Sequence, residues 1–184
     1  MILPIRAYGD PVLRKICQTI SPDYPGLGQL ISDMYETMYE SNGVGLAAPQ
    51  VGRDIRLFII DTNAFSDKKI KGVKKTFINA QLVEENGNLW DFEEGCLSIP
   101  RIRENIKRKS ELVIKYQDES FVWHQESFDD MAARVIQHEY DHIEGVLFVD
   151  HLSPLKKQLI KGKLQNISKG KVDVDYKMKF YLKK

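Results

Sequence analysis

The chain has 184 residues, a length that predicts one domain with a core of its own and no need of disulfides to fold. Hydrophobic residues make up 42% and charged residues 29% of the sequence, and this composition excludes an intrinsically disordered protein. The 27 Lys and Arg residues nearly balance the 26 Asp and Glu residues, so the formal net charge of +1 argues against a general nucleic-acid binder.

Neither the cysteines nor the start of the chain predicts export. Only Cys17 and Cys96 are present, too few for a disulfide framework, so a reducing compartment is expected. The first residues, MILPIRAYGDP, lack the basic and then continuously apolar segments of a signal peptide. No apolar run approaches the about 20 residues of a membrane span. We therefore expect a cytoplasmic protein with no membrane partner.

Helical patterns come first along the chain. Asp10 followed by Pro11 predicts a capped short helix. Apolar residues at spacings of three and four predict a second helix after Pro25, which ends at the sequence Ser-Asn-Gly at 41–43. These apolar residues are Leu27, Leu30, Ile31, Met34, Tyr35 and Met38. A glycine-rich segment then precedes a predicted strand at 56–61.

Residues 75–126 have the pattern of β-strands. The runs TFIN, WDF, ELVIKY and SFVWHQ are rich in β-branched and aromatic residues. Turn signals at 85–88 and at 117–118 separate these runs. A polar, lysine-rich loop is expected before them, at 63–75.

The chain ends in two further predicted helices. Residues 128–143 return to helical spacing, and Gly145 follows that helix as its terminator. A short strand, VLFV at 146–149, leads into a last helix at 155–168. Residues 171–184 alternate weakly and predict either an edge strand or a loose tail. This mixture of elements predicts an α+β fold.

The sharpest chemical signal is HEYDH at 138–142, an HExxH pattern within a predicted helix. His138 and His142 are one helical turn apart on one face, so both imidazoles can reach one metal ion. Glu139 can reach water bound to that ion without being a ligand. We therefore predict a metal site on a central helix, around which small antiparallel or mixed sheets pack, with a further helix at the C-terminus.

The motif does not supply a third ligand. A metzincin would place a third histidine where Phe148 stands, and a gluzincin needs a downstream glutamate, but none follows Glu144. This absence disfavours a zinc endopeptidase. Cys96 is the best upstream candidate, because a thiolate and two imidazoles leave one position open for water; the alternative is an ordinary buried cysteine. The downstream candidates are Asp150, His151, Asp173 and Asp175.

Three segments together carry a family resemblance. They are GVGLAAPQVG at 43–52, EGCLSIP at 94–100 and QHEYDHIEGVLF at 137–148. In this order they resemble the signature segments of peptide deformylase, and the resemblance spans residues 5–168. It implies an enzyme that removes the N-terminal formyl group from nascent polypeptides that begin with formylmethionine.

The resemblance also implies a metal centre. It makes Cys96, His138 and His142 the ligands of one divalent ion and Glu139 the general acid and base. Metal-bound water would then attack the formyl carbon, because the ion brings the pKa of that water toward neutrality. Fe²⁺ is the implied physiological ion, and the same ligands accept Zn²⁺, Ni²⁺ or Co²⁺.

Further roles follow from the resemblance. The side-chain amide of Gln50 and the backbone N–H of Leu97 would hold the oxyanion. The segment 43–45 would pair with the substrate peptide as an added strand, Val44, Met131 and Val135 would line the methionine pocket, and Glu94 and Arg103 would form a charged pair beside the channel. A plain turn is the alternative at Gly43, and ordinary core positions are the alternative for Met131 and Val135. The predicted substrate-binding residues are Gly43, Val44, Gly45, Glu94, Gly95, Arg103, Met131 and Val135.

The net charge of +1 is unevenly distributed. From His151 onward there are ten lysines and two aspartates, a local charge of +8, which leaves −7 on residues 1–150. We expect one catalytic domain over 1–184, with a catalytic body at 1–150 and a basic helix and tail at 151–184. Together with the nascent-chain substrate that the resemblance implies, the basic segment predicts docking to the ribosome near the exit tunnel, with no specific DNA partner. A solvated helix face is one alternative, and an RNA-binding module with an inactive metal site is another.

Overall fold

The computed structural model describes residues 1–65 and 72–181. Within these residues, the largest sheet has five strands, all antiparallel, in the order β2-β3-β4-β5-β6. Its strands are β2 (Gly45–Ala47), β3 (Leu57–Asp61), β4 (Lys74–Cys96), β5 (Ile99–Gln117) and β6 (Trp123–Asp129). The predicted loop at 63–75 lies partly outside the described residues, and its first three residues form a 3-10 turn, η3 (Asn63–Phe65).

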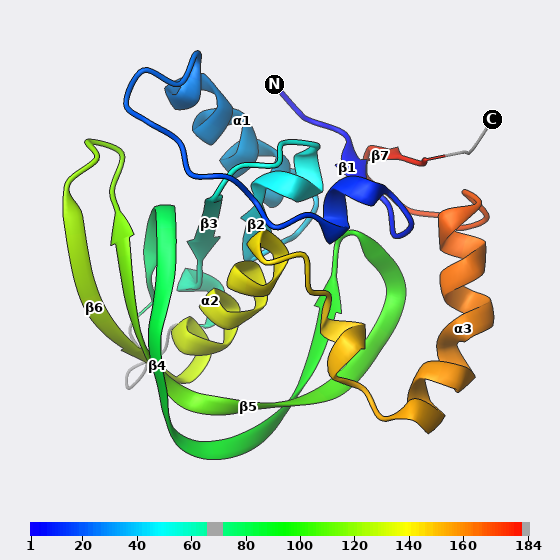
Figure 1. The fold of residues 1–184 in the computed structure, drawn as a ribbon. Helices are drawn as coiled ribbons and strands as arrows, with labels where there is room; N and C mark the ends of the chain where they lie inside the picture. Colours follow the sequence, from blue (N-terminus) through cyan, green and yellow to red (C-terminus); the bar gives the residue numbers. More distant parts are fainter. Residues whose placement is uncertain (66–71, 182–184) are drawn as a thin grey trace.

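The longest strands, β4 and β5, form a twisted ribbon that curves around the rest of the fold (Figure 1). The predicted turn at 85–88 is wrong, because β4 continues through it. The register between β4 and β5 shifts between Asn86 and Leu89, and Gly87 has a φ of +75° there. Such a bulge bends a strand without ending it, so TFIN and WDF belong to one strand. The predicted turn at 117–118 is confirmed, since β5 ends at Gln117.

Helix α2 (Asp130–Ile143) runs through the centre of the molecule, with α1 (Leu27–Glu40) and α3 (Pro154–Ser168) near the outside (Figure 1). Ten of the fourteen residues of α2 are buried. Ala133 and Ile136 contribute to a core cluster with Phe58 and Phe77, whose rings stack 4.7 Å apart. Burying one such apolar side chain stabilises the fold by about 1.5–3 kcal/mol, so the helix that bears HExxH is firmly fixed. The predicted α+β class is confirmed.

Two predictions are wrong at the ends of α2: where the helix begins, and which element follows it. The helix starts at Asp130 rather than residue 128, because β6 keeps its pairing with β5 up to Asp129. VLFV is not a strand but leads into a 3-10 turn, η4 (Phe148–His151). The Asp150 carboxylate accepts the N–H of Leu147 at 2.8 Å, and this bond favours a turn over an extended backbone. Two further 3-10 turns are η1 (Pro11–Arg14) and η2 (Ala48–Val51).

The C-terminal segment packs back onto the N-terminus. Helix α3 buries Ile160, Leu164 and Ile167 in a second apolar cluster. After α3, β7 (Met178–Lys179) pairs in parallel with β1 (Ile5–Arg6), so a segment near the end of the chain lies beside one near its start (Figure 1). An edge strand was one of the two predictions for residues 171–184: residues 178–179 form such a strand, residues 171–177 do not, and residues 182–184 lie outside the described part of the chain. In the described part of the chain, no helix is long and apolar enough to cross a membrane.

Candidate metal centre

Three potential ligands converge between the end of β4 and the middle of α2. The donor atoms of Cys96, His138 and His142 all lie within 4.8 Å of one another, and Cys96 Sγ is 3.3 Å from His142 Nε2. The two imidazole rings are 5.1 Å apart between centroids, as their i and i+4 positions on one helix face predict. The downstream candidates Asp150, His151, Asp173 and Asp175 join no such group within residues 1–65 and 72–181.

The chemistry of these donors suits a divalent transition metal. Burial by itself would raise the pKa of Cys96, but His142 and His138 beside it lower that pKa to about 5. The sulfur is therefore a thiolate near neutral pH, which is the form that binds metals. One thiolate and two imidazoles are a ligand set that accepts iron, zinc, nickel or cobalt.

Glu94 supports His138 from behind. Its Oε2 lies 2.9 Å from Nδ1 of His138, which leaves Nε2 of that ring free to face the other donors. The same carboxylate accepts bonds from Arg108 at 2.7 Å and from Arg134 at 2.9 Å, and all three charged side chains are at most 6% exposed. Burial alone would raise the pKa of Glu94, but His138 and Arg108 hold it well below its usual range, so the carboxylate stays ionised.

The predicted pair of Glu94 and Arg103 is wrong. Arg103 lies opposite Gly95 in the sheet and therefore shares a face with Glu93, whose carboxylate it approaches at 3.7 Å near solvent. Glu94 points to the other face, as Arg108 does opposite Trp90. The register between β4 and β5 decides these partners, and the sequence does not give that register.

Sequence reasoning also missed Arg134. This side chain is 2% exposed and donates to Glu94, to the carbonyl of Ile106 at 3.0 Å and to the carbonyl of Trp90 at 2.7 Å. Its guanidinium carbon lies 4.4 Å from the centre of the Trp90 ring. Its position four residues before His138 was a usable signal, because both side chains then share one face of the helix.

Glu139 is placed to handle a proton. Its side chain is buried, and its Oε2 has no hydrogen-bond partner in the part of the chain that is described. Burial raises the pKa of Glu139 to about 7. Gly45 makes room for it, since a Cβ there would come 2.8 Å from Glu139 Cδ. A carboxylate with a pKa near neutrality can both accept and return a proton.

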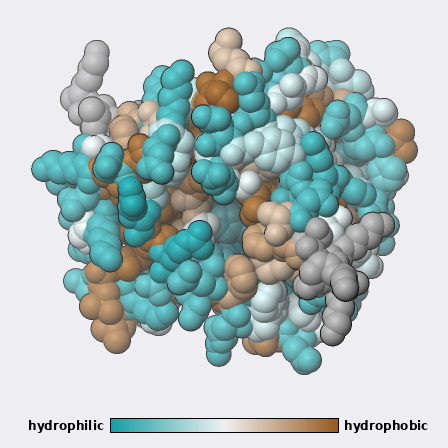
Figure 2. Space-filling model, turned by 180° about the vertical axis from the view of Figure 1, so that it is seen from behind, coloured by the Kyte–Doolittle hydropathy of each residue, from teal (hydrophilic) through white to brown (hydrophobic). Residues whose placement is uncertain are grey.

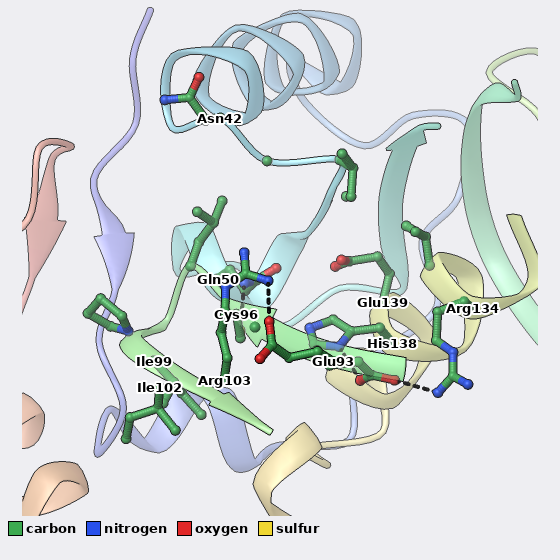
Figure 3. Close-up of a pocket in the computed structure, with 18 of the residues that line it drawn as sticks. Asn42, Gln50, Glu93, Cys96, Ile99, Ile102, Arg103, Arg134, His138 and Glu139 are labelled. Atoms are coloured by element: carbon green, nitrogen blue, oxygen red, sulfur yellow. Dashed lines mark hydrogen bonds and ion pairs between the residues drawn. The ribbon is translucent and has the colours of Figure 1, made fainter. Parts of the chain in front are cut away.

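Gln50 is oriented by its neighbours. Its Oε1 accepts the N–H of Ala47 at 2.8 Å, so its amide nitrogen must face the other way. That nitrogen lies 3.4 Å from Cys96 Sγ and 3.3 Å from Ser98 Oγ. Figure 3 shows Gln50 beside Cys96, with Glu139 facing them from α2. The arrangement directs an N–H donor toward the metal ligands.

A pocket of about 660 Å³ opens above these residues. Figure 2 shows this face of the molecule hollowed near its middle, with apolar side chains inside a mainly hydrophilic surround. All eight predicted substrate-binding residues line the pocket, as do Gln50, Cys96, Leu97, His138 and Glu139. The residues that line it without having been predicted include Phe92, Ile99, Ile102, Arg134, Val174 and Tyr176.

Comparisons with known proteins find similarity to one family. The family model for polypeptide deformylase matches residues 2–158. The chain is 59% identical to a peptide deformylase of Flavobacterium johnsoniae, over 98% of this chain and 96% of that protein, and 58% identical to one of Cytophaga hutchinsonii over the whole of both. A crystal structure of a peptide deformylase from Legionella pneumophila has a TM-score of 0.80 at 37% identity, covering 92% of this chain and 96% of that one. The peptide deformylase structure from Thermotoga maritima has a TM-score of 0.75 at 40% identity, covering 84% and 99%.

Proposed function

The chain belongs to the polypeptide deformylase family of enzymes, and we propose that it removes the N-terminal formyl group from formylmethionine at the start of nascent polypeptides. The observation that carries this proposal is the convergence of Cys96, His138 and His142 beside Glu139 at a pocket lined by the glycine-rich segment 43–45. Because its substrates begin at the ribosome, we place the enzyme in the cytoplasm.

We assign Cys96, His138 and His142 as ligands of one divalent ion, Fe²⁺ in the cell, with Zn²⁺, Ni²⁺ or Co²⁺ able to replace it. The fit is supported by the thiolate character of Cys96 and by Glu94, which holds His138 in position. When bound, such an ion supplies Lewis acidity, which makes water nucleophilic near neutral pH.

The chain's own residues then move the proton and stabilise the charge. Glu139 takes a proton from the attacking water and returns it to the leaving amine, and its pKa of about 7 supports both steps. The amide nitrogen of Gln50 and the backbone N–H of Leu97 donate to the oxygen of the formyl group as it becomes negative. The bond from Ala47 to Gln50 supports this role, because it fixes which end of the amide faces the site.

The peptide is held along β2. This strand lies at the edge of the five-stranded sheet, so an extended substrate can add to it by backbone hydrogen bonds. Val44, Met131 and Val135 form the apolar pocket for the methionine side chain, and Gly95 and Arg103 lie along the channel. Glu94 acts through His138 rather than on the peptide.

The test is formate release from a formyl-Met-Ala-Ser peptide by protein loaded with Fe²⁺ or Ni²⁺ without oxygen. Glu139→Gln should retain the metal but lower kcat by about 10²–10⁴-fold, because the proton acceptor is lost. Glu40→Gln, at the exposed end of α1, is the matched control and should behave as wild type. A wild-type enzyme that leaves the formyl group in place contradicts the proposal, and cleavage inside the peptide, read by mass spectrometry, would favour an endopeptidase.

We further propose that residues 1–184 act as one catalytic domain that docks to the ribosome through α3. The exposed face of this helix carries Lys157, Lys161 and Lys163 among other residues, while its apolar face packs on the body. Lysines spaced along one helix suit the phosphates of ribosomal RNA.

A further inference from the structure

The C-terminal tail after α3 has a clear two-residue period. Along residues 171–180, charged side chains at odd positions are exposed and the intervening side chains are partly buried. The partly buried residues are Val172, Val174, Tyr176, Met178 and Phe180. This alternation is typical of a strand with one face against the protein, so the tail has an inner side that contacts the body.

The tail is fastened at both ends of its path. Near its start, the backbone carbonyl of Asp173 accepts a bond from Arg101 Nε at 3.1 Å. Near its end, the carbonyl of Lys177 accepts the N–H of Ile5 at 2.8 Å where β7 pairs with β1. Val172, Met178 and Phe180 also pack against the apolar cluster that contains Ile99 and Ile102. The segment between these anchors is therefore held in one place beside the pocket.

That segment contacts the site itself. Val174, Asp175 and Tyr176 line the same pocket as Gln50, Cys96 and Glu139. The hydroxyl of Tyr176 donates to the backbone carbonyl of Leu97 at 2.7 Å. On the other side of the turn, the carbonyl of Ser98 accepts the N–H of Tyr8 at 2.8 Å. The turn after Cys96 is thus held from two directions, by the tail and by the N-terminal segment.

We propose that the tail is part of the active site and that Tyr176 is a positioning residue for the turn that bears Cys96 and Leu97. The catalytic consequence of this inference rests on the proposed function, whereas the positioning of the turn by Tyr176 does not depend on that function. By holding the carbonyl of Leu97, Tyr176 limits rotation of the neighbouring peptide group, whose N–H is the proposed oxyanion donor. The basic segment 151–184 therefore contributes to the reaction as well as to docking.

The first test measures the turn directly. Tyr176→Phe removes the hydroxyl and keeps the ring, and Tyr181→Phe makes the same change at an exposed tail residue outside the pocket. Hydrogen–deuterium exchange, read on peptides that cover residues 94–99, should be faster in Tyr176→Phe than in wild type and unchanged in Tyr181→Phe. Equal exchange in all three proteins overturns the positioning role.

The second test measures catalysis with formyl-Met-Ala-Ser and the Ni²⁺-loaded enzyme. Tyr176→Phe should lower kcat by about 5- to 10-fold, because it loosens one oxyanion donor without removing it. KM should change less than about 2-fold, since the ring still forms the pocket wall. A variant with wild-type kcat overturns the catalytic half of the proposal. If wild type itself releases no formate, the proposed function fails, and the exchange experiment still decides the role of Tyr176.

Discussion

At the scale of single residues, Glu94 connects the charged groups behind the metal centre. Its carboxylate is buried between Arg108, Arg134 and Nδ1 of His138. A buried charge is tolerated when it is paired and fully hydrogen-bonded, and here two guanidinium groups meet both conditions. The orientation of His138 therefore depends on a residue that would touch neither metal nor substrate.

This dependence gives a prediction for metal affinity. Glu94→Gln should weaken binding of Zn²⁺ by about 10–100-fold, because the neutral amide is a poorer acceptor for the imidazole N–H. Competition against a chromophoric chelator measures the effect. Glu93→Gln is the matched control, since this neighbour points to the other face and is 63% exposed. Equal affinities in the two folded variants would show that Glu94 does not support His138.

Arg134 gives a prediction for stability. Its guanidinium satisfies Glu94 and two backbone carbonyls in a buried site. Arg134→Ala leaves these acceptors with fewer donors, and breaking a buried pair on one side costs about 3–5 kcal/mol of the free energy of unfolding. Urea denaturation measures this loss. A loss below about 1 kcal/mol would mean that Arg108 alone satisfies the carboxylate.

The residues that sequence reasoning found and those that it missed differ in how they are positioned. His138, Glu139 and His142 are fixed relative to one another by one helix, so their spacing alone predicted their proximity. Arg108 and Arg134 meet Glu94 through the β4–β5 register and the packing of α2 on that ribbon. Such contacts depend on bulges and tertiary packing, and a local pattern does not contain them.

At the scale of elements, replacing a glycine by alanine should have opposite effects on stability in β4 and in α3. Gly87 sits in the bulge of β4 with a φ of +75°, and the Ser110 hydroxyl occupies the space that a Cβ would take. Gly87→Ala should therefore lower the free energy of unfolding by about 1–2 kcal/mol. Gly162 is an interior residue of α3 with no neighbouring atom within 4 Å of an added Cβ. Gly162→Ala should raise the stability by about 0.5–1 kcal/mol, because alanine restricts the unfolded chain.

Urea denaturation of the two variants measures whether each substitution lowers or raises the free energy of unfolding. A Gly87→Ala variant as stable as wild type would mean that the bulge relaxes to a conformation open to alanine. A destabilised Gly162→Ala variant would mean that α3 is not a regular helix at that point.

Elements with a repeated local pattern were predicted correctly, and elements that depend on tertiary or side-chain hydrogen bonds were not. The helices at 27–40 and 154–168 were found because their apolar faces recur over several turns. The sequence Glu-Asn-Gly-Asn at 85–88 has the composition of a turn, but pairing with β5 on both sides keeps the backbone extended. VLFV has the composition of a strand, but the Asp150 carboxylate favours a 3-10 turn. In both places a tertiary or side-chain hydrogen bond outweighs local propensity.

At the scale of the whole molecule, acid stability depends on carboxylates that join distant segments. Asp150 of η4 is paired with Arg14 of η1 and also accepts the N–H of Leu147. Burial alone would raise the pKa of Asp150, but Arg14 and that N–H hold it below its usual value. A carboxyl group with a lowered folded pKa stabilises the fold above its unfolded pKa of about 3.9, and this contribution is lost as the pH falls through the folded pKa.

Asp150→Asn should therefore make the free energy of unfolding less dependent on pH under acidic conditions. From pH 5 down to pH 3, the free energy of unfolding should fall more steeply in wild type than in Asp150→Asn. The difference should be about 1 kcal/mol or less, because the carboxylate is 36% exposed and solvent screens the pair. Urea denaturation at several pH values measures it, and parallel curves would contradict a lowered pKa at Asp150.

The uneven distribution of charge along the chain is also uneven in space, because many of the C-terminal lysines lie on one outer helix of the folded molecule. Helix α3 lies at the side of the molecule away from β6, with its buried face on the body and its lysines outward (Figure 1). Deleting the helix would remove Ile160 and Leu164 and expose the apolar residues of the body that they cover, among them Ile102 and Phe148, so a truncation cannot separate docking from folding. Reversing exposed charges avoids this problem, and Lys156 is left unchanged because it pairs with Glu104 at 2.7 Å.

Replacing Lys157, Lys161 and Lys163 together by glutamate should weaken co-sedimentation with ribosomes while turnover of formyl-Met-Ala-Ser stays within about 2-fold of wild type. The first effect follows from repulsion by RNA phosphates and should be largest at low salt, where screening is weakest. The second follows because none of these lysines lines the pocket. The matched control replaces Lys74, Lys107 and Lys115, three exposed lysines of β4 and β5, by glutamate, which makes the same change in net charge away from α3. Equal loss of binding in both triple variants would show that net charge, rather than α3, governs docking, and unchanged binding in both would rule out electrostatic docking.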